Sequence, residues 1–408
     1  MIPMEVDREF VKLCGEVGNL TEAVTGVSIV DAYYGPDDLA PAQQSKDRKP
    51  EVLIHELSAL SDRIKSEIDQ PLRSKYLINE IHSLLSITRW MSGEDISYID
   101  LVERVFGIKA TRFAESEISD AIEEVEIAFS DYPGKDTRER LERFDLDGQL
   151  HGEEARNYIE GELQKNAMGV SELFRVKVYD IMGSKVTDNG VEYKAVTDKP
   201  WSGYNYYQGN YKSINEFNVD RPFSRHAMES VIYHEYEHHV SNLWREKAYH
   251  ENNWIDLCIV PLTCRCVISE GTADTAIDFL GINEGTDDAR RIKAQMTLSR
   301  MCTMNAALML NHEGASFDDT VDYLVERIFR SEERVKPFLQ FIKPRTMDGK
   351  PNLWAPYYFN YLIGRRDFVY PTFRKARENG MLAEFFRTVY LDPYSGSSRT
   401  WHEAFDWL

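Results

Sequence analysis

Apolar side chains in the first 180 residues recur at intervals of three and four, the period of a helix with one buried face. The clearest repeats cover residues 51–69 and 73–90, and Pro71 stands between them at a position typical of a helix start. Further helices are expected near 97–107, 115–130 and 152–168. This half of the chain carries no recognisable chemical motif, so we expect it to form a scaffold.

The pattern then changes to one typical of strands. The segments 176–180 and 191–196 alternate apolar and polar side chains, and Asp-Asn-Gly at 188–190 favours a tight turn between them. This arrangement predicts a hairpin. The stretch 201–218 is rich in Tyr, Asn and Gly, and a short edge strand is expected at 213–219.

Helical spacing returns after Pro222. One long helix is predicted at 224–247 and another at 268–280. Later helices are expected at 286–311, 317–330, 333–342 and 380–390, with an aromatic segment at 353–370.

The predicted fold class is therefore mainly α, with a small β element near residues 175–220. The 408 residues exceed the usual size of a single core. We expect a helical N-terminal region at 1–172 that serves as scaffold and cleft wall. A second region at 173–408 is expected to hold the small sheet, further helices and the reactive residues.

Charge narrows the possible functions. The chain has 48 Lys and Arg against 68 Asp and Glu, a formal charge of −20. Nucleic acid is therefore a poor partner, because phosphate binding requires clustered cations. No apolar run approaches the ~20 residues of a membrane helix, and the first residues lack the pattern of a secretory leader. We expect a cytoplasmic protein without a membrane partner, and the sequence leaves its oligomeric state open.

Cysteine usage gives no sign of a disulfide framework, because an odd number of cysteines occurs in a long chain. Cys264 and Cys266 lie close in sequence, but cysteine zinc sites usually combine two such pairs and no second pair exists. Free core thiols are the simpler interpretation for the five residues, which are Cys14, Cys258, Cys264, Cys266 and Cys302.

A metal-binding pattern stands in the predicted helix 224–247. Its sequence is His234-Glu235-Tyr-Glu-His238. On a helix, residues four apart share a face, so both imidazoles can reach one metal ion. Glu235 is then placed beside a metal-activated water, where it can act as general base.

A catalytic zinc ion needs a third protein ligand. The extended pattern with a third His does not apply, because Trp244 occupies that position. Glu270 supplies a ligand from the helix 268–280, and Asp274 lies one turn further on the same face, where it can orient a ligand imidazole. The predicted ligands are thus His234, His238 and Glu270, holding one zinc ion per chain.

This pair of helices resembles the gluzincin zinc metallopeptidases of the thermolysin-like clan. The helical character of the chain is similar to their neurolysin-like and carboxypeptidase Taq-like branch. Three short motifs also resemble a poorly characterised bacterial family of predicted peptidases; they are Tyr33-Tyr-Gly-Pro36, Ser269-Glu-Gly271 and Tyr361-x-x-Gly364. The resemblance implies an oligopeptidase or carboxypeptidase acting on peptides in a deep channel.

Simpler interpretations exist for most of these residues. Glu270 also suits the first turn of a helix, where the dipole favours acids, and Asp274 also suits a solvated face. His239 is expected to be a surface or packing residue, and Glu237 is expected to be solvated. A di-iron bundle would need a second Glu-x-x-His unit, and the sequence has none.

Peptide hydrolysis also needs a hydrogen-bond donor for the developing oxyanion. The aromatic segment 353–370 is the best source, and Tyr361 is the first choice, ahead of Tyr358 and Tyr357. Arg365 and Arg366 are candidates to bind a peptide carboxylate, although a surface basic pair is the simpler interpretation.

The sequence therefore predicts a zinc-dependent hydrolase, most simply a metallopeptidase with Glu235 as general base. One alternative is a non-catalytic protein in which zinc clamps two helices. Another is a zinc hydrolase of a non-peptide amide.

Overall fold

The structure is a computed structural model that describes residues 5–199, 203–220, 223–282 and 286–408. It has 67% helix and 8% strand, which confirms the predicted mainly α class with small sheets. Trp201 and Pro222, which bound two of the predicted segments, lie outside the described residues. No described helix combines the length and apolar character that a membrane span requires.

Every helix expected from the sequence has a counterpart. The α-helices are α1 Val6–Thr25, α2 Pro50–Glu67, α3 Pro71–Met91, α4 Tyr98–Phe106, α5 Glu115–Ala128, α6 Thr137–Asp147, α7 Gly152–Asn157, α8 Gln164–Phe174, α9 Asp180–Met182, α10 Arg225–Asn252, α11 Arg265–Leu280, α12 Asp287–Leu308, α13 Phe317–Arg327, α14 Glu332–Ile342, α15 Trp354–Tyr357, α16 Asn360–Ile363, α17 Tyr370–Glu378, α18 Leu382–Leu391 and α19 Trp401–Ala404. Short 3₁₀ segments are η1 Asp37–Leu39, η2 Pro41–Gln43 and η5 Ile255–Cys258, and π-helical segments are η3 Tyr158–Leu163, η4 Arg175–Tyr179, η6 Met309–Glu313 and η7 Gly364–Val369. The strands are β1 Val30–Tyr33, β2 Gln149–Leu150, β3 Val191–Val196, β4 Gly203–Gly209, β5 Lys212–Asn218, β6 Phe223–Ser224 and β7 Ile259–Pro261.

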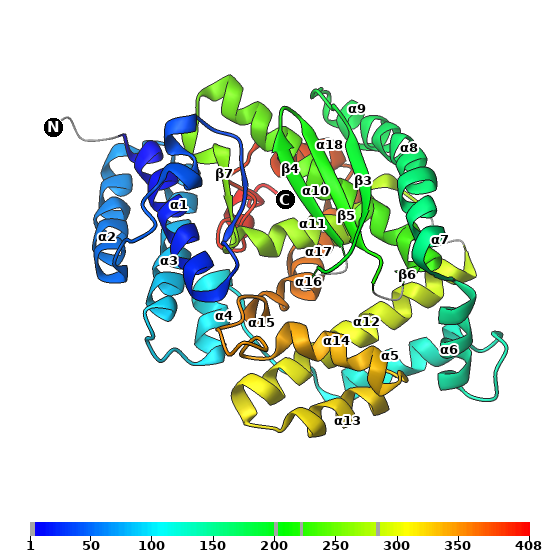
Figure 1. Cartoon of the computed structure of the whole chain (residues 1–408). Helices are drawn as coiled ribbons and strands as arrows, with labels where there is room; N and C mark the ends of the chain where they lie inside the picture. Colours follow the sequence, from blue (N-terminus) through cyan, green and yellow to red (C-terminus); the bar gives the residue numbers. More distant parts are fainter. Residues whose placement is uncertain (1–4, 200–202, 221–222, 283–285) are drawn as a thin grey trace.

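Helices α10 and α11 pack against each other in the middle of the molecule (Figure 1). The sheet of β3, β5 and β4 covers α10 on one side, and α1, α2 and α3 pack together at one end. Helices α12, α13 and α14 form the lower part of the view, where α12 also packs on α5. The central helix pair is therefore enclosed by elements from all parts of the chain.

The hairpin predicted around residues 188–190 is wrong. Residues 175–179 form the π-helical segment η4, and Val178 and Met182 are buried at helical spacing. Only β3 of the expected pair is a strand, and it pairs in parallel with β5. The antiparallel hairpin joins β4 to β5 instead, and its turn at Asn210 and Tyr211 has positive φ angles of 52° and 58°.

The strand expected at 213–219 is present as β5, but it is the central strand and not an edge. The turn between β4 and β5 is fixed to α10, because Glu246 accepts hydrogen bonds from the backbone N–H groups of Asn210 and Tyr211 at 2.8 and 2.9 Å. A second pairing, β1 with β7, joins the N-terminal region to the segment before α11.

The hydrophobic core does not follow the boundary expected between residues 172 and 173. That boundary falls inside α8, and each of the two large core clusters draws residues from both regions. The division at 1–172 and 173–408 therefore remains a prediction from the sequence.

Two glycines bring α11 against the segment that follows α16. A Cβ atom at Gly364 would lie 1.9 Å from the carbonyl oxygen of Val267, and one at Gly271 would lie 2.6 Å from the carbonyl carbon of Gly364. Only glycine allows such an approach of two backbones. The two motifs Ser269-Glu-Gly271 and Tyr361-x-x-Gly364 thus meet in space.

Gly364→Ala is expected to destabilise the fold by about 3 kcal/mol, because the added methyl group forces α11 and η7 apart. Gly169→Ala in α8 is the control, since a Cβ atom there meets nothing within 4 Å; it should leave stability unchanged or raise it by up to about 1 kcal/mol. Denaturant unfolding measures both, and equal stabilities for the two variants would contradict the close approach.

Candidate metal centre

The two histidines of the motif lie one turn apart on α10. This helix starts at Ser224, whose hydroxyl accepts a hydrogen bond from the backbone N–H of Ala227 at 3.4 Å. No Gly or Pro interrupts it, so the spacing between His234 and His238 is regular. Their ring centroids are 4.8 Å apart with the planes at 87°.

Glu270 reaches the same point from α11. Its Oε2 lies 3.4 Å from Nε2 of His234 and 3.9 Å from Nε2 of His238, and the two Nε2 atoms are 3.2 Å apart. Ligand atoms around a tetrahedral zinc ion lie about 3.4 Å from one another, and a point equidistant from these three atoms is about 2 Å from each. Among the described residues, His234, His238 and Glu270 form the single group of three or more His, Cys, Asp or Glu side chains that could hold a metal ion.

The chemistry of the donor atoms fits a metal ion. Glu270 Oε2 is buried and has no hydrogen-bond partner among the described residues, while its Oε1 accepts a hydrogen bond from the Tyr357 hydroxyl at 2.5 Å. A buried carboxylate oxygen without a partner is costly. A zinc ion held by Nε2 of both histidines and by this oxygen removes that cost, and the two-His, one-Glu set is one that zinc accepts.

The remaining ring nitrogens are held by hydrogen bonds. Nδ1 of His234 donates to Asp274 at 2.8 Å, and Nδ1 of His238 lies 3.3 Å from the hydroxyl of Ser269. Asp274 is itself paired with Arg300 of α12 through two hydrogen bonds. These contacts fix both rings with Nε2 toward the shared point, as outer partners of metal ligands do.

The electrostatics of the site favour a cation. Burial opposes a charged His234, but its contacts with Asp274 and Glu270 outweigh that effect and raise its pKa well above the usual value. Burial lowers the pKa of His238 to about 4. Burial raises the pKa of Asp274, but Arg300 and His234 outweigh it, so this pKa falls far below its usual range. The ionised carboxylates thus surround a place for positive charge.

The carboxylate of Glu235 lies beside this centre and makes no hydrogen bond with any described residue. Burial raises the pKa of its carboxyl group to about 7; His234 acts against this rise, and Glu270 adds to it. A Cβ atom at Gly203 in β4 would lie 3.8 Å from Glu235 Oε1, so the absence of a side chain there keeps space in front of the carboxylate. A group with these properties is available for proton transfer.

The aromatic segment folds back to the centre, as the prediction for Tyr361 requires. Burial, together with the charges of Glu270 and Glu235, raises the pKa of Tyr361 well above its usual value, so the hydroxyl keeps its proton. This hydroxyl makes no hydrogen bond within the described part of the chain, whereas that of Tyr357 is used on Glu270. Tyr358 lies toward Thr303. Tyr361 thus lies close to Glu270 and Glu235 with a hydroxyl group that no described residue uses.

The two arginines proposed for substrate binding do not face the centre. Arg365 donates to the backbone carbonyl of Asp274 at 2.8 Å and to the carboxylate of Asp278 at 2.6 Å, so it braces α11. Arg366 pairs with the adjacent Asp367 and is exposed. A role for either in binding a substrate carboxylate stays a prediction without a supporting contact.

One expectation for α10 is wrong, because the middle of this helix is enclosed on all sides. Glu237 was expected to be solvated but is 0% exposed, and it accepts hydrogen bonds from Ser241, Thr272 and Tyr390. His239, expected to be a surface or packing residue, is a packing residue that is 0% exposed and hydrogen-bonded on both ring nitrogens.

The contacts of His239 are with the hydroxyl of Ser213 at 2.8 Å and with Asp188 at 3.0 Å. The order of these groups is that of a Ser-His-Asp triad, but Ser213 is fully buried and unable to meet a substrate. The group therefore fastens α10 to β5 and to the loop before β3.

The role of Arg300 was not predicted from the sequence. No local pattern marks this residue, because its partner Asp274 lies on another helix.

Comparison with known proteins adds information on the fold alone. No protein-family model and no curated protein matches the sequence. One solved structure, described as "the putative lipoprotein from Colwellia psychrerythraea", is similar with 14% sequence identity and a TM-score of 0.52, over 98% of this chain and 71% of that one. Another, "a putative lipoprotein of unknown function from Shewanella oneidensis", has 12% identity and a TM-score of 0.46, over 88% and 72%.

We expect the purified protein to contain about one zinc ion per chain, because two histidines and a glutamate suit this borderline-soft ion. His234→Ala and Glu270→Ala should each lose most of the metal. His250→Ala is the control, since this residue is on the same helix and its side chain is 52% exposed. Elemental analysis measures the zinc content, and full occupancy in both ligand variants would show that the ligands are assigned incorrectly.

Asp274→Asn should weaken zinc binding about 10–100-fold without abolishing it, because the change removes the charge that orients His234. Asp278→Asn provides the matched control, since Asp278 lies one turn further along α11 and pairs with Arg365. Competition with a chelator measures the affinity. Equal curves for Asp274→Asn and wild type would exclude the orienting role.

Proposed function

We propose that this protein is a zinc-dependent hydrolase, and more specifically a metallopeptidase similar to the helical, neurolysin-like gluzincins. The observation that carries the proposal is the convergence of His234 Nε2, His238 Nε2 and the unpartnered Glu270 Oε2, with Glu235 free beside them. The sequence resemblance and the mainly α fold support it. The cytoplasmic location expected from the sequence stays a prediction.

Zinc in such a site supplies Lewis acidity to a water molecule and to a substrate carbonyl. In the proposed reaction Glu235 accepts a proton from the attacking water and later transfers it to the leaving amine. The hydroxyl of Tyr361 donates a hydrogen bond to the oxygen that gains negative charge. Asp274 and Arg300 keep the His234 ring in one orientation throughout.

A purely structural zinc ion is disfavoured. Structural sites are usually closed by four protein ligands. Within the described residues, no fourth His, Cys, Asp or Glu side chain joins the group. The five cysteines are buried and free, so a zinc site closed by a cysteine ligand is also unsupported. The three ligands leave one coordination position open, as hydrolysis requires.

A peptide substrate is favoured over another amide by the sheet. Strand β4 is at the edge of its sheet, and its first residue, Gly203, faces Glu235. The unpaired edge of a strand offers backbone N–H and C=O groups to an extended chain. A non-peptide amide gains nothing from such an edge.

Glu235→Gln should keep its zinc and lose activity by about 10²–10⁴-fold, because only proton transfer is removed. The assay is digestion of a mixed-peptide library read by mass spectrometry, with chelator-treated wild type as the metal-free control. Near-normal cleavage by Glu235→Gln would exclude it as the base. A wild-type protein that holds zinc and cleaves no peptide, yet hydrolyses small amides, would favour the other hydrolase class.

Tyr361→Phe should lower kcat about 10²–10³-fold with a smaller change in KM, because the hydrogen bond forms mainly in the transition state. Zinc content should be unchanged. Tyr357→Phe is the matched comparison: its hydroxyl bonds to Glu270, so its loss should reduce metal affinity instead. Wild-type kinetics for Tyr361→Phe would place the oxyanion donor elsewhere.

A further inference from the structure

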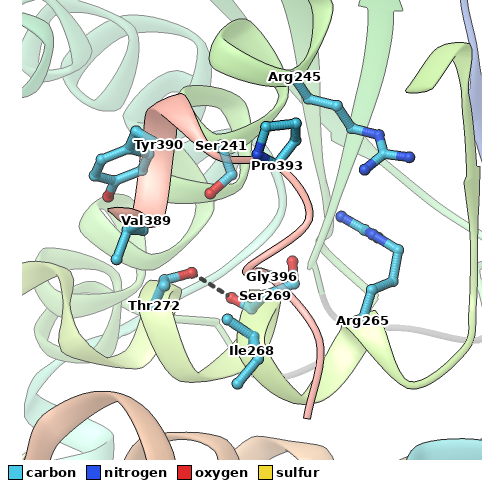
Figure 2. A pocket seen from close by; sticks show the side chains of 10 residues that line it. All are labelled: Ser241, Arg245, Arg265, Ile268, Ser269, Thr272, Val389, Tyr390, Pro393 and Gly396. Carbon is cyan, nitrogen blue, oxygen red and sulfur yellow. Dashed lines mark hydrogen bonds between the residues drawn. The ribbon is translucent and has the colours of Figure 1, made fainter. Parts of the chain in front are cut away.

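A cavity of about 60 Å³ lies behind the metal centre, between α10, α11 and the loop that follows α18 (Figure 2). Helix α10 contributes Ser241 and Arg245 to its wall, and α11 contributes Arg265 and Ser269. The loop closes another side with Gly396. The two guanidinium groups point toward one another at one end of this cavity (Figure 2).

Arg245 is buried without a carboxylate partner. Arg245 is 7% exposed. Its guanidinium group donates hydrogen bonds to the backbone carbonyls of Leu257 at 3.0 Å and Ile259 at 3.2 Å. Its third contact is the hydroxyl of Tyr76 at 3.4 Å. None of these groups carries a negative charge, and Asp256, whose carboxylate acts on Arg245, is already paired with Arg73.

Arg265 is even less satisfied. It makes no hydrogen bond and no ion pair with any residue that the structure describes, although it lines the cavity. The charge of Arg245 repels that of Arg265, and the buried Glu80 acts on both arginines in the opposite sense. One buried and one half-buried arginine thus share one hollow, and no described residue accepts a hydrogen bond from Arg265. A buried charge such as that of Arg245 is normally paired.

The opposite wall does not neutralise them. Ser241, Thr272 and Tyr390 line it, and their hydroxyl groups donate to Glu237, which lies beyond the wall. The donors that face the cavity are therefore the guanidinium groups. Guanidinium N–H groups bind anions strongly, in charge-assisted hydrogen bonds.

The volume limits what can bind. A water molecule needs roughly 10–15 Å³ measured in this way, so about 60 Å³ holds a few waters or one small ion. An amino acid or a sugar acid exceeds this volume and would project through the open side of the cavity. We propose that a small inorganic anion binds in this cavity between Arg245 and Arg265, joining the N-terminal part of α11 to α10.

The site is distinct from the metal centre but adjoins it. Ser269 lines the cavity and also lies 3.3 Å from Nδ1 of His238, on the side of the ring away from the shared metal point. Anion binding therefore stabilises the arrangement of α10 and α11 on which that ring depends. The proposal stands independently of the hydrolase activity, because its evidence is a different set of residues.

Thermal unfolding at constant ionic strength tests the site. Sodium gluconate, whose anion is too large for the cavity, is replaced stepwise by sodium chloride or sodium phosphate. Wild-type protein should show a saturable rise in Tm of about 2–5 °C with at least one of these anions. Arg265→Gln should lose the rise, because one of the two guanidinium groups that face the anion is removed.

Arg374→Gln on α17 is the matched control, since this arginine is 58% exposed and should leave the anion response intact. Wild-type crystals soaked in bromide and in selenate give a second, independent measurement. An anomalous peak between the two guanidinium groups is expected. The absence of a peak with both anions, or equal anion responses in wild type and Arg265→Gln, would overturn the proposal.

Discussion

The structure depends on one constraint: helix α10 carries a series of polar side chains that are buried and must each find a partner. Glu237, His239, Asn242, Arg245 and Glu246 are all at most 7% exposed. Each such group without a partner costs about 1–3 kcal/mol. The partners come from every surrounding layer, because the sheet binds His239 and Glu246, α11 and α18 bind Glu237, and the segment before β7 binds Arg245. The polar contacts therefore specify how these layers sit around the helix.

The candidate metal centre is one of the places where a buried polar atom has no partner among the described residues. Asp274, Arg300, Ser269 and Tyr357 satisfy the outer atoms of His234, His238 and Glu270. The three inner atoms are directed at each other instead. The unpartnered Glu270 Oε2 and the two imidazole nitrogens near it form a donor set that suits the proposed cation. The surrounding contacts hold these ligands in place, so the proposed binding needs no rearrangement.

Sequence patterns reveal those parts of the centre that depend on local geometry. The four-residue spacing of His234 and His238 and the one-turn spacing of Glu270 and Asp274 follow directly from the helical period. Arg300 and Tyr357 contribute through contacts between distant segments, which no local period encodes. The error at Glu237 has a related origin: assigning it to solvent assumes that a helix has one exposed face, and the middle of α10 has none. The alternation at 176–180 was likewise compatible with a strand until tertiary packing placed Val178 and Met182 on one helical face.

The glycine contact between α11 and η7 links the stability of the fold to the geometry of the centre. Glu270 is adjacent to Gly271, and Tyr361 precedes Gly364 by three residues, so the position of this backbone contact sets how near the tyrosine comes to the glutamate. A larger side chain at either glycine separates the two segments by the width of a methyl group or more. Hydrogen bonds to a developing charge lose strength over such a displacement. The two glycines therefore serve the proposed chemistry by the same close approach through which they hold the core together.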